Sequence, residues 1–179
     1  MAEDNGEEVS ALKGMTKIFP RDRSQWLHRD EDTAYVHFLR GEPPGFPRFS
    51  RRCDLYAFWG GTVSYLMLQY AHWTGCDPIY VIGMDMSYDV PDGAGKRITS
   101  EQADVNHFHP DYFGPGRRYH DPEVDRMIRC LERAGKEIVH DGSRIYNAGL
   151  GGRLEVYPRV DFQGVFRNED NDAGLSRTR

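Results

Sequence analysis

A loop of unusual composition, DVNHFHPDYFGPG at residues 104–116, gathers side chains that can move protons or bind a cation. Histidine titrates near neutral pH, so His107 or His109 could serve as a general base. Asp104 and Asp111 could orient an imidazole or bind a divalent cation, because carboxylates are hard oxygen ligands. The prolines and glycines of the stretch exclude a long helix or strand, so we predict a loop.

The same loop contains Asn106 and Tyr112, which could donate hydrogen bonds to a substrate. The structural alternative is that the rings of Phe108, Tyr112 and Phe113 pin the loop to the protein while its polar groups satisfy the backbone. Two histidines, two carboxylates and three aromatic rings exceed what an inert turn requires. We therefore favour a substrate-facing loop over a metal site, and a metal site over an inert turn.

The elements before this loop follow the order strand, glycine turn, helix, strand. DLYAFW (54–59) is typical of a buried strand, and Thr62 can cap a helix that Gly75 ends. PIYVIGMD (78–85) is a continuous apolar run typical of a parallel strand buried on both faces. We predict a right-handed βαβ unit over these residues. Helical spacing predicts the buried face of the helix: Val63, Leu66, Met67, Tyr70 and Ala71.

A second helix and two strands are predicted after the loop. Asp121 would cap the helix and Pro122 would be its first residue, with an apolar stripe running from Val124 to Ile138. SRIYNA (143–148) and LEVYPRVDF (154–162) are strand-like, and the turn GLGG separates them. The predicted class is α/β with a mostly parallel sheet and flanking helices. We expect a single domain over residues 15–167 between flexible tails at 1–14 and 168–179.

Several polar motifs follow the predicted strands, and ligands bind beyond the carboxyl ends of parallel strands. At Gly60, Gly61 and Thr62 the free amides of a helix start favour a phosphate or carboxylate, and a tight turn with a capping threonine is the structural alternative. Asp85 ends its strand and could hold a sugar hydroxyl or a cation, or cap the next loop. Asn147 could lie near the same edge, although turn chemistry explains the glycines after it equally well.

The composition bounds the class of protein. A chain of 179 residues, 39% of them hydrophobic, can build one domain with a core. The net charge of -5 argues against general nucleic-acid binding, and the chain contains no apolar run long enough to span a membrane. The three cysteines are widely spaced and the acidic N-terminus does not resemble a secretory signal, so we expect a reduced, cytoplasmic protein.

Four segments, taken in order, resemble one broad superfamily: GGTVSYLMLQYAHWTGCDPIYVIGMDMSY, DVNHF, DYFGPG and IYNAGLGGRLEVYPRVDF. It joins the 6-hydroxymethylpterin diphosphokinase (MptE-like) domain to the motility-associated-factor glycosyltransferases and, more remotely, bacterial sialyltransferases. The similarity covers about residues 50–166. It implies a sialyltransferase-like, Rossmann-type fold and transfer chemistry on a nucleotide-activated donor. Family members usually carry another βα portion before DLYAFW, so the chain would correspond to the C-terminal part of the family domain.

The resemblance also implies roles for individual residues. Gly61 and Thr62 would face the donor or its phosphates, Asp85 and Tyr88 would line the reaction cleft, and Asn147 would lie deeper in the same pocket. The adjacent loop would approach the acceptor through Asn106 and His107, with His107 as the general base.

The leading hypothesis is a glycosyltransferase-like enzyme that transfers a sugar from a nucleotide-activated donor to a glycan acceptor and needs no cofactor. The first alternative is transfer of pyrophosphate from ATP to a pterin alcohol, which requires Mg²⁺ and would make Asp85, Asp104 and Asp111 candidate metal ligands. A second alternative is a truncated, non-catalytic remnant that binds a carbohydrate or a partner chain. An incomplete α/β domain exposes a sheet edge, which favours a homo-oligomer or a completing partner chain.

Overall fold

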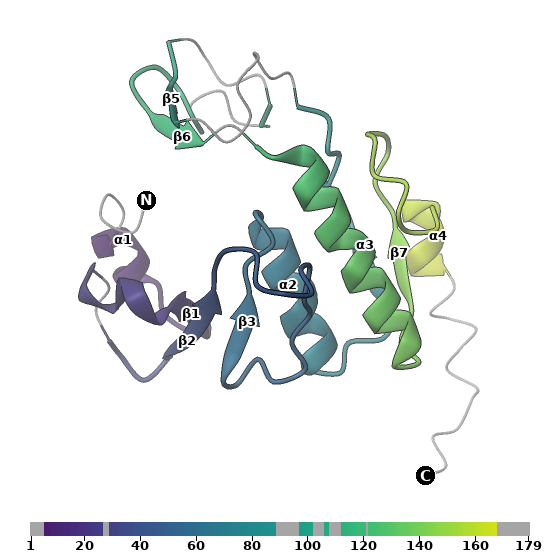
Figure 1. The fold of residues 1–179 in the computed structure, drawn as a ribbon, viewed down its shortest axis with the longest axis horizontal. Coiled ribbons are helices and arrows are strands. Elements are labelled where there is room, and N and C mark those ends of the chain that lie inside the picture. The colour runs from purple at the N-terminus through teal and green to yellow at the C-terminus, as the bar shows by residue number, and fades with distance from the viewer. Residues whose placement is uncertain are drawn as a thin grey trace. The chain divides into compact units, whose positions relative to one another are not determined.

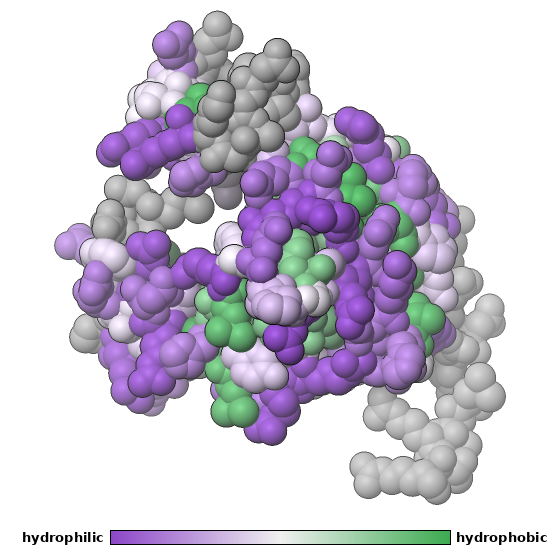
Figure 2. All heavy atoms as spheres, in the orientation of Figure 1, coloured by the Kyte–Doolittle hydropathy of each residue, from purple (hydrophilic) through white to green (hydrophobic). Residues whose placement is uncertain are grey.

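The computed structural model describes residues 6–26, 29–88, 97–101, 106–107, 112–120 and 122–167 (Figure 1). The chain divides into two compact units, Met1–Gly75 and Cys76–Arg179, where the sequence predicts one domain over 15–167. Helices alternate with short strands that pair mainly in parallel, so the chain is α/β in the broad sense. Hydrophilic residues cover most of the face shown in Figure 2.

A three-stranded parallel sheet is the framework of the first unit. β1 (Lys17–Pro20) pairs with β2 (Thr33–Leu39), and β2 pairs with β3 (Tyr56–Phe58). α1 (Gly6–Ala11) precedes the sheet, and the 3-10 helix η1 (Arg21–Trp26) joins its first two strands. β3 is the strand predicted from DLYAFW, whereas the two strands before it were not predicted, and α1 lies in the segment expected to be a tail.

A largely buried ion pair between Lys17 and Asp30 links the segment before β1 to the segment before β2. Lys17 is only 6% exposed, and its ammonium donates hydrogen bonds to the Asp30 carboxylate at 2.6 Å and to the Leu12 carbonyl at 3.0 Å. The hydrogen bond from Lys17, followed by that from Thr33, holds the pKa of Asp30 well below its ordinary value. The charged form of Asp30 therefore stabilises the folded state.

The ends of α2 (Val63–Trp73) confirm the predicted capping. The side chain of Thr62 accepts a hydrogen bond from the Ser64 amide at 3.3 Å. Gly75 follows the helix at φ +83°, a conformation that glycine adopts without strain, and its amide donates to the His72 carbonyl. Both ends are set by residues within one turn of the helix, which is why the sequence identifies them.

The predicted buried face of α2 is wrong for Val63 and Met67, which are exposed. The buried residues include Tyr65, Leu68 and Gln69 instead. The carbonyl oxygen of the Gln69 side chain accepts hydrogen bonds from the amides of Ser50 and Phe58, and its amide group donates to the carbonyls of Phe58 and Tyr65. A fully buried glutamine is stable here because these four hydrogen bonds satisfy its polar atoms. The spacing of hydrophobic residues cannot identify a buried polar residue of this kind.

The second unit is built on two parallel strands, β4 (Ile79–Val81) and β7 (Ile145–Asn147). α3 (Val124–His140) packs against β7, and α4 (Phe162–Arg167) ends the described chain. The apolar stripe of α3 largely matches the prediction, and its buried residues are Met127, Cys130, Leu131, Ala134 and Ile138. A separate antiparallel pair is formed by β5 (Arg97–Thr99) and β6 (Arg118–His120).

Several details of the second unit differ from the prediction. The strand predicted over residues 78–85 and buried on both faces is the short β4, which ends at Val81 and leaves Tyr80 exposed, so Asp85 lies after the strand and does not end it. α3 begins at Val124 with Glu123 as its N-cap, so Pro122 is not its first residue; Asp121 lies outside the described residues. The segment LEVYPRVDF is not a strand, since it makes one isolated parallel bridge, between Arg159 and Asn147, and its last residue begins α4. The segment is held instead by burial of Leu154 and Tyr157, which are three residues apart rather than the two that a strand requires.

The predicted βαβ unit spans both units of the chain, so its crossover stays a prediction. Among the described residues, no helix is both long enough and apolar enough to cross a membrane.

Candidate functional site

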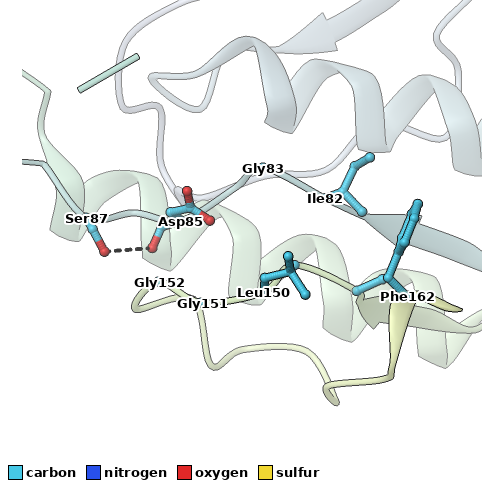
Figure 3. A pocket seen from close by; sticks show the side chains of 10 residues that line it. Ile82, Gly83, Asp85, Ser87, Leu150, Gly151, Gly152 and Phe162 are labelled. Atoms are coloured by element: carbon cyan, nitrogen blue, oxygen red, sulfur yellow. Dashed lines mark hydrogen bonds between the residues drawn. The ribbon is translucent and has the colours of Figure 1, made fainter. Parts of the chain in front are cut away.

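A pocket of about 660 Å³ lies where β4 and β7 end (Figure 3). This volume is within the range of small-molecule sites, roughly 300–1,000 Å³. The pocket lies at the carboxyl ends of two parallel strands, the edge at which the sequence predicts a ligand. Its described lining comes from the loops after both strands and from the first residue of α4: Ile82, Gly83, Asp85, Ser87, Ala148, Gly149, Leu150, Gly151, Gly152 and Phe162.

The loop after β4 presents its polar side chains because one residue is anchored in an unusual conformation. Met86 is buried and adopts φ 53°, a left-handed conformation that non-glycine residues rarely take. Its neighbours Asp85 and Ser87 are exposed. Ser87 donates a hydrogen bond to the main-chain oxygen of Asp85 at 3.4 Å (Figure 3). Such backbone strain concentrates at functional sites, where the surrounding structure must hold it in place.

The loop after β7 is folded around the side chain of Asn147, which is buried. Its amide group donates to the Leu154 carbonyl at 2.8 Å, and its carbonyl oxygen accepts from the Gly149 amide at 2.9 Å. The asparagine thus fastens both ends of the glycine loop, residues 149–152, to the end of the strand.

The two loops touch at Gly152. This residue has φ +85°, and a Cβ atom added to it would lie 2.5 Å from both the Cα and the main-chain oxygen of Asp85. The next amide, that of Arg153, donates to the same oxygen of Asp85 at 2.6 Å. Only glycine permits this backbone-to-backbone approach, which sets the position of the Asp85 side chain relative to the glycine loop.

Arg159 binds the glycine loop through its carbonyl groups. Its guanidinium donates to the carbonyls of Gly149 at 3.4 Å, Gly151 at 3.1 Å and Gly152 at 3.1 Å, and it pairs with the Glu155 carboxylate at 2.8 Å. Glu155 is the main cause that raises the pKa of Arg159, and the Asp85 carboxylate adds a smaller effect. The negative charge of Asp85 therefore interacts with the guanidinium that binds the glycine loop.

Asp85 offers its carboxylate to the pocket. No described residue donates a hydrogen bond to its side-chain oxygens, and the side chain is exposed. Burial, followed by the charges of Asp85 and Tyr112, raises the pKa of the half-buried Tyr88. Tyr88 therefore keeps its proton as a hydrogen-bond donor and lies within electrostatic reach of both groups.

The described part of the 104–116 loop is an aromatic cluster. The His107 ring stacks on Tyr112 with centroids 4.3 Å apart and meets Phe113 edge-on at 5.2 Å. Phe113 in turn stacks on Tyr119 at 5.1 Å. These rings pin this part of the loop, which is the structural role considered for them. The remaining predicted loop residues lie outside the described residues: Asp104, Phe108, His109 and Asp111.

Asn106 and His107 are half-buried and do not belong to the described lining of the pocket. An electrostatic link between the two regions runs through Tyr88, because the charges of both Asp85 and Tyr112 contribute to the raised pKa of Tyr88. The structure therefore brings the predicted residues Asp85, Tyr88 and Tyr112 into one neighbourhood.

Gly60, Gly61 and Thr62 lie at the start of α2 in the first unit, whereas Asp85 belongs to the second. Gly60 is buried, Gly61 has φ +84°, and Thr62 caps its own helix. This geometry is the tight turn with a capping threonine that the sequence offers as the structural alternative.

Within the described ranges, no group of three or more histidine, cysteine, aspartate or glutamate side chains could hold a metal ion. Two of the three candidate Mg²⁺ ligands, Asp104 and Asp111, lie outside those ranges. None of the three cysteines, all of which lie in the described ranges, forms a disulfide, and Cys53 and Cys130 are buried.

Comparison of the chain with family models, with curated proteins and with solved structures gives no match. The pocket contains residues that sequence reasoning did not single out, namely the apolar Ile82, Leu150 and Phe162. The signal for Leu150 was its place between glycines in a turn, where an apolar side chain has no core to enter. Arg159 carried no signal, because its role depends on carbonyl groups seven to ten residues away.

Proposed function

We propose that this chain is a glycosyltransferase-like enzyme that holds a nucleotide-activated sugar in the pocket at the ends of β4 and β7. The observation that carries the proposal is the two-ended character of this pocket. Asp85 and Ser87 lie at one end, Ile82 and Phe162 lie at the other, and Leu150 lies between them (Figure 3).

The polar end suits the hydroxyl groups of a ribose or of the transferred sugar. A carboxylate at the carboxyl end of a parallel strand is well placed to accept hydrogen bonds from neighbouring sugar hydroxyls. Hydrogen bonds to a charged acceptor contribute about 1.5–3 kcal/mol each. Because none of the described side chains donates to the carboxylate of Asp85, its acceptor capacity is available to a ligand.

The apolar end suits the flat face of a nucleobase or a sugar ring. Leu150 is 100% exposed and Ile82 is 59% exposed, which is unusual for large apolar side chains lining one pocket. Covering such a side chain contributes roughly 1.5–3 kcal/mol. Leu150 and Ile82 therefore gain from a ligand that the folded chain alone does not supply.

In the proposed transfer, a hydroxyl of the acceptor glycan loses its proton to His107, and its oxygen bonds to the anomeric carbon of the donor sugar. The bond from that carbon to the phosphate oxygen breaks, and the nucleotide leaves with the electron pair. The stacking of His107 on Tyr112 would fix the orientation of the imidazole. Tyr88, whose raised pKa keeps it protonated, would donate a hydrogen bond near Asp85.

A thermal-shift screen tests donor binding. The panel is CMP, UDP, GDP, their sugar conjugates and ATP, each with and without Mg²⁺, on the wild type, Asp85→Asn and Asp77→Asn. Asp77 is the matched control, an exposed carboxylate that precedes β4 at its opposite end and pairs with Arg144. A ligand at about 100 times its Kd raises stability by roughly 2.7 kcal/mol.

We expect a metal-independent shift with one nucleotide sugar that Asp85→Asn reduces and Asp77→Asn leaves unchanged. A shift only with ATP and Mg²⁺ would instead support pyrophosphoryl transfer. No shift across the panel would refute the proposal and favour a non-catalytic remnant. Once a donor is found, His107→Ala should lower turnover by about 10²–10⁴-fold while donor binding persists.

A further inference from the structure

Three carbonyl groups of the glycine loop face the same side chain. Three of its carbonyls, those of Gly149, Gly151 and Gly152, accept hydrogen bonds from the single guanidinium of Arg159. The loop lines the pocket, but Arg159 does not. The guanidinium therefore lies behind the loop, and these carbonyls point away from the pocket.

The geometry of the peptide bond fixes where the corresponding amides point. In a trans peptide the N–H and C=O bonds of one plane point in opposite directions. The carbonyls of Gly149 and Gly151 belong to the same planes as the amides of Leu150 and Gly152, so these two N–H groups point toward the pocket. Neither amide is a donor in any hydrogen bond between described residues. The third plane supports this geometry, because the Arg153 amide, opposite the Gly152 carbonyl, reaches the neighbouring loop at Asp85.

We infer that the amides of Leu150 and Gly152 form a subsite for the phosphate oxygens of a nucleotide, and that Arg159 is the residue that positions them. The inference rests on the proposed function and states how the donor lies in the pocket. Its phosphates would bind the glycine loop, and its sugar hydroxyls would face Asp85. Backbone amides turned to one side of a glycine-rich loop are a common way to hold phosphate. The Arg159 guanidinium, which also pairs with Glu155, holds the carbonyl side of these peptide planes.

The start of α2 is the competing phosphate site suggested by the sequence, and two amides of its first turn already donate to Thr62. The Ser64 amide donates to the Thr62 side chain at 3.3 Å, and the Tyr65 amide donates to the Thr62 carbonyl at 3.3 Å. A phosphate bound by the Ser64 and Tyr65 amides would replace these bonds, whereas the Leu150 and Gly152 amides are donors in no hydrogen bond between described residues.

Amide NMR of the ¹⁵N-labelled chain tests the inference directly. The wild type is titrated with UDP, GDP and CMP, and separately with uridine, guanosine and cytidine. We expect one nucleotide to move the Leu150 and Gly152 amide resonances downfield, as a new acceptor does, while its nucleoside leaves them in place. Nucleotide-dependent shifts at Thr62 and Ser64 in place of the glycine loop would overturn the inference and leave the proposed function standing. No binding at either loop would overturn both.

Variants of Arg159 test the positioning role on the same ligand. Arg159→Met and Arg159→Lys should each weaken nucleotide binding by about 10-fold or more, because lysine keeps the charge but lacks the planar fork that spans three carbonyls. Both should also speed hydrogen exchange of the Leu150 and Gly152 amides. Arg144→Met is the control, since Arg144 pairs with Asp77 away from this loop, and its nucleotide Kd should stay within about 2-fold of wild type. Wild-type affinity in Arg159→Lys would show that the planar guanidinium is not required. Wild-type affinity in Arg159→Met would show that Arg159 does not position the amides at all. If neither Arg159 variant folds, the wild-type titration decides the inference by itself.

Discussion

Gly152→Ala should separate the two loops of the pocket more directly than any other single change. The added Cβ would lie 2.5 Å from the Cα and main-chain oxygen of Asp85, whereas ordinary contact begins at 3.4 Å. Both atoms belong to the backbone, so no side-chain rotation can relieve the overlap. The loops must part, or the backbone of residue 152 must leave its φ of +85°.

The expected cost follows from two contributions. A non-glycine residue in the left-handed region loses roughly 1–2 kcal/mol. Parting the loops breaks the Arg153–Asp85 hydrogen bond of 2.6 Å, which contributes about 1 kcal/mol. The free energy of unfolding should therefore fall by about 2–3 kcal/mol, which corresponds to a decrease in Tm of roughly 4–12 °C for a chain of this size.

Gly151→Ala is the matched control for this prediction. Gly151 lies in the same loop and lines the same pocket, but its added Cβ would meet nothing within 4 Å and its φ lies outside the left-handed region. We expect a change within about 0.5 kcal/mol. Thermal and urea unfolding of the two variants give the comparison, and equal Tm values for both would refute the close approach of the loops.

Three further substitutions test polar contacts within the two units. Asp30→Asn should lower Tm at about pH 7. The difference from wild type should shrink as the pH falls below about 4, because Asp30, whose pKa is lowered in the folded state, stabilises the fold only while its carboxylate is charged. A pH-independent difference would contradict the role of Lys17. Gln69→Leu removes four buried hydrogen bonds and should lower the free energy of unfolding in urea by at least about 3 kcal/mol, so a loss under about 1 kcal/mol would argue against this network. Asn147→Ala leaves two loop groups unpaired and should cost about 2 kcal/mol, with faster hydrogen exchange in the glycine loop as its specific signature.

Elements set by neighbouring residues could be predicted from the sequence. Thr62 and Gly75 lie within a turn of the helix they delimit, and the apolar stripe of α3 repeats at the helical period. The apolar run before Asp85 identified the strand, although β4 ends at Val81 and Asp85 follows it at a distance of four residues. The pocket edge was also predictable, since it depends only on the direction of two parallel strands.

Features that depend on distant hydrogen bonds could not be predicted in this way. The buried face of α2 turns toward Gln69 because its partners come from residues 50–65, which a hydrophobic pattern does not include. Arg159 resembles any surface arginine until the glycine loop is folded around it. LEVYPRVDF alternates well enough to suggest a strand, but its buried residues Leu154 and Tyr157 are spaced for an irregular segment.

The measurement that tests the central claim most directly is calorimetric titration of the best nucleotide sugar into the wild type and Asp85→Asn. If the pocket at the ends of β4 and β7 holds the donor, loss of a hydrogen bond to a charged acceptor should weaken Kd by about 10–100-fold. Asp77→Asn, at the other end of β4, should bind like the wild type. Equal affinity in Asp85→Asn and the wild type would show that the donor, if it binds, does so elsewhere.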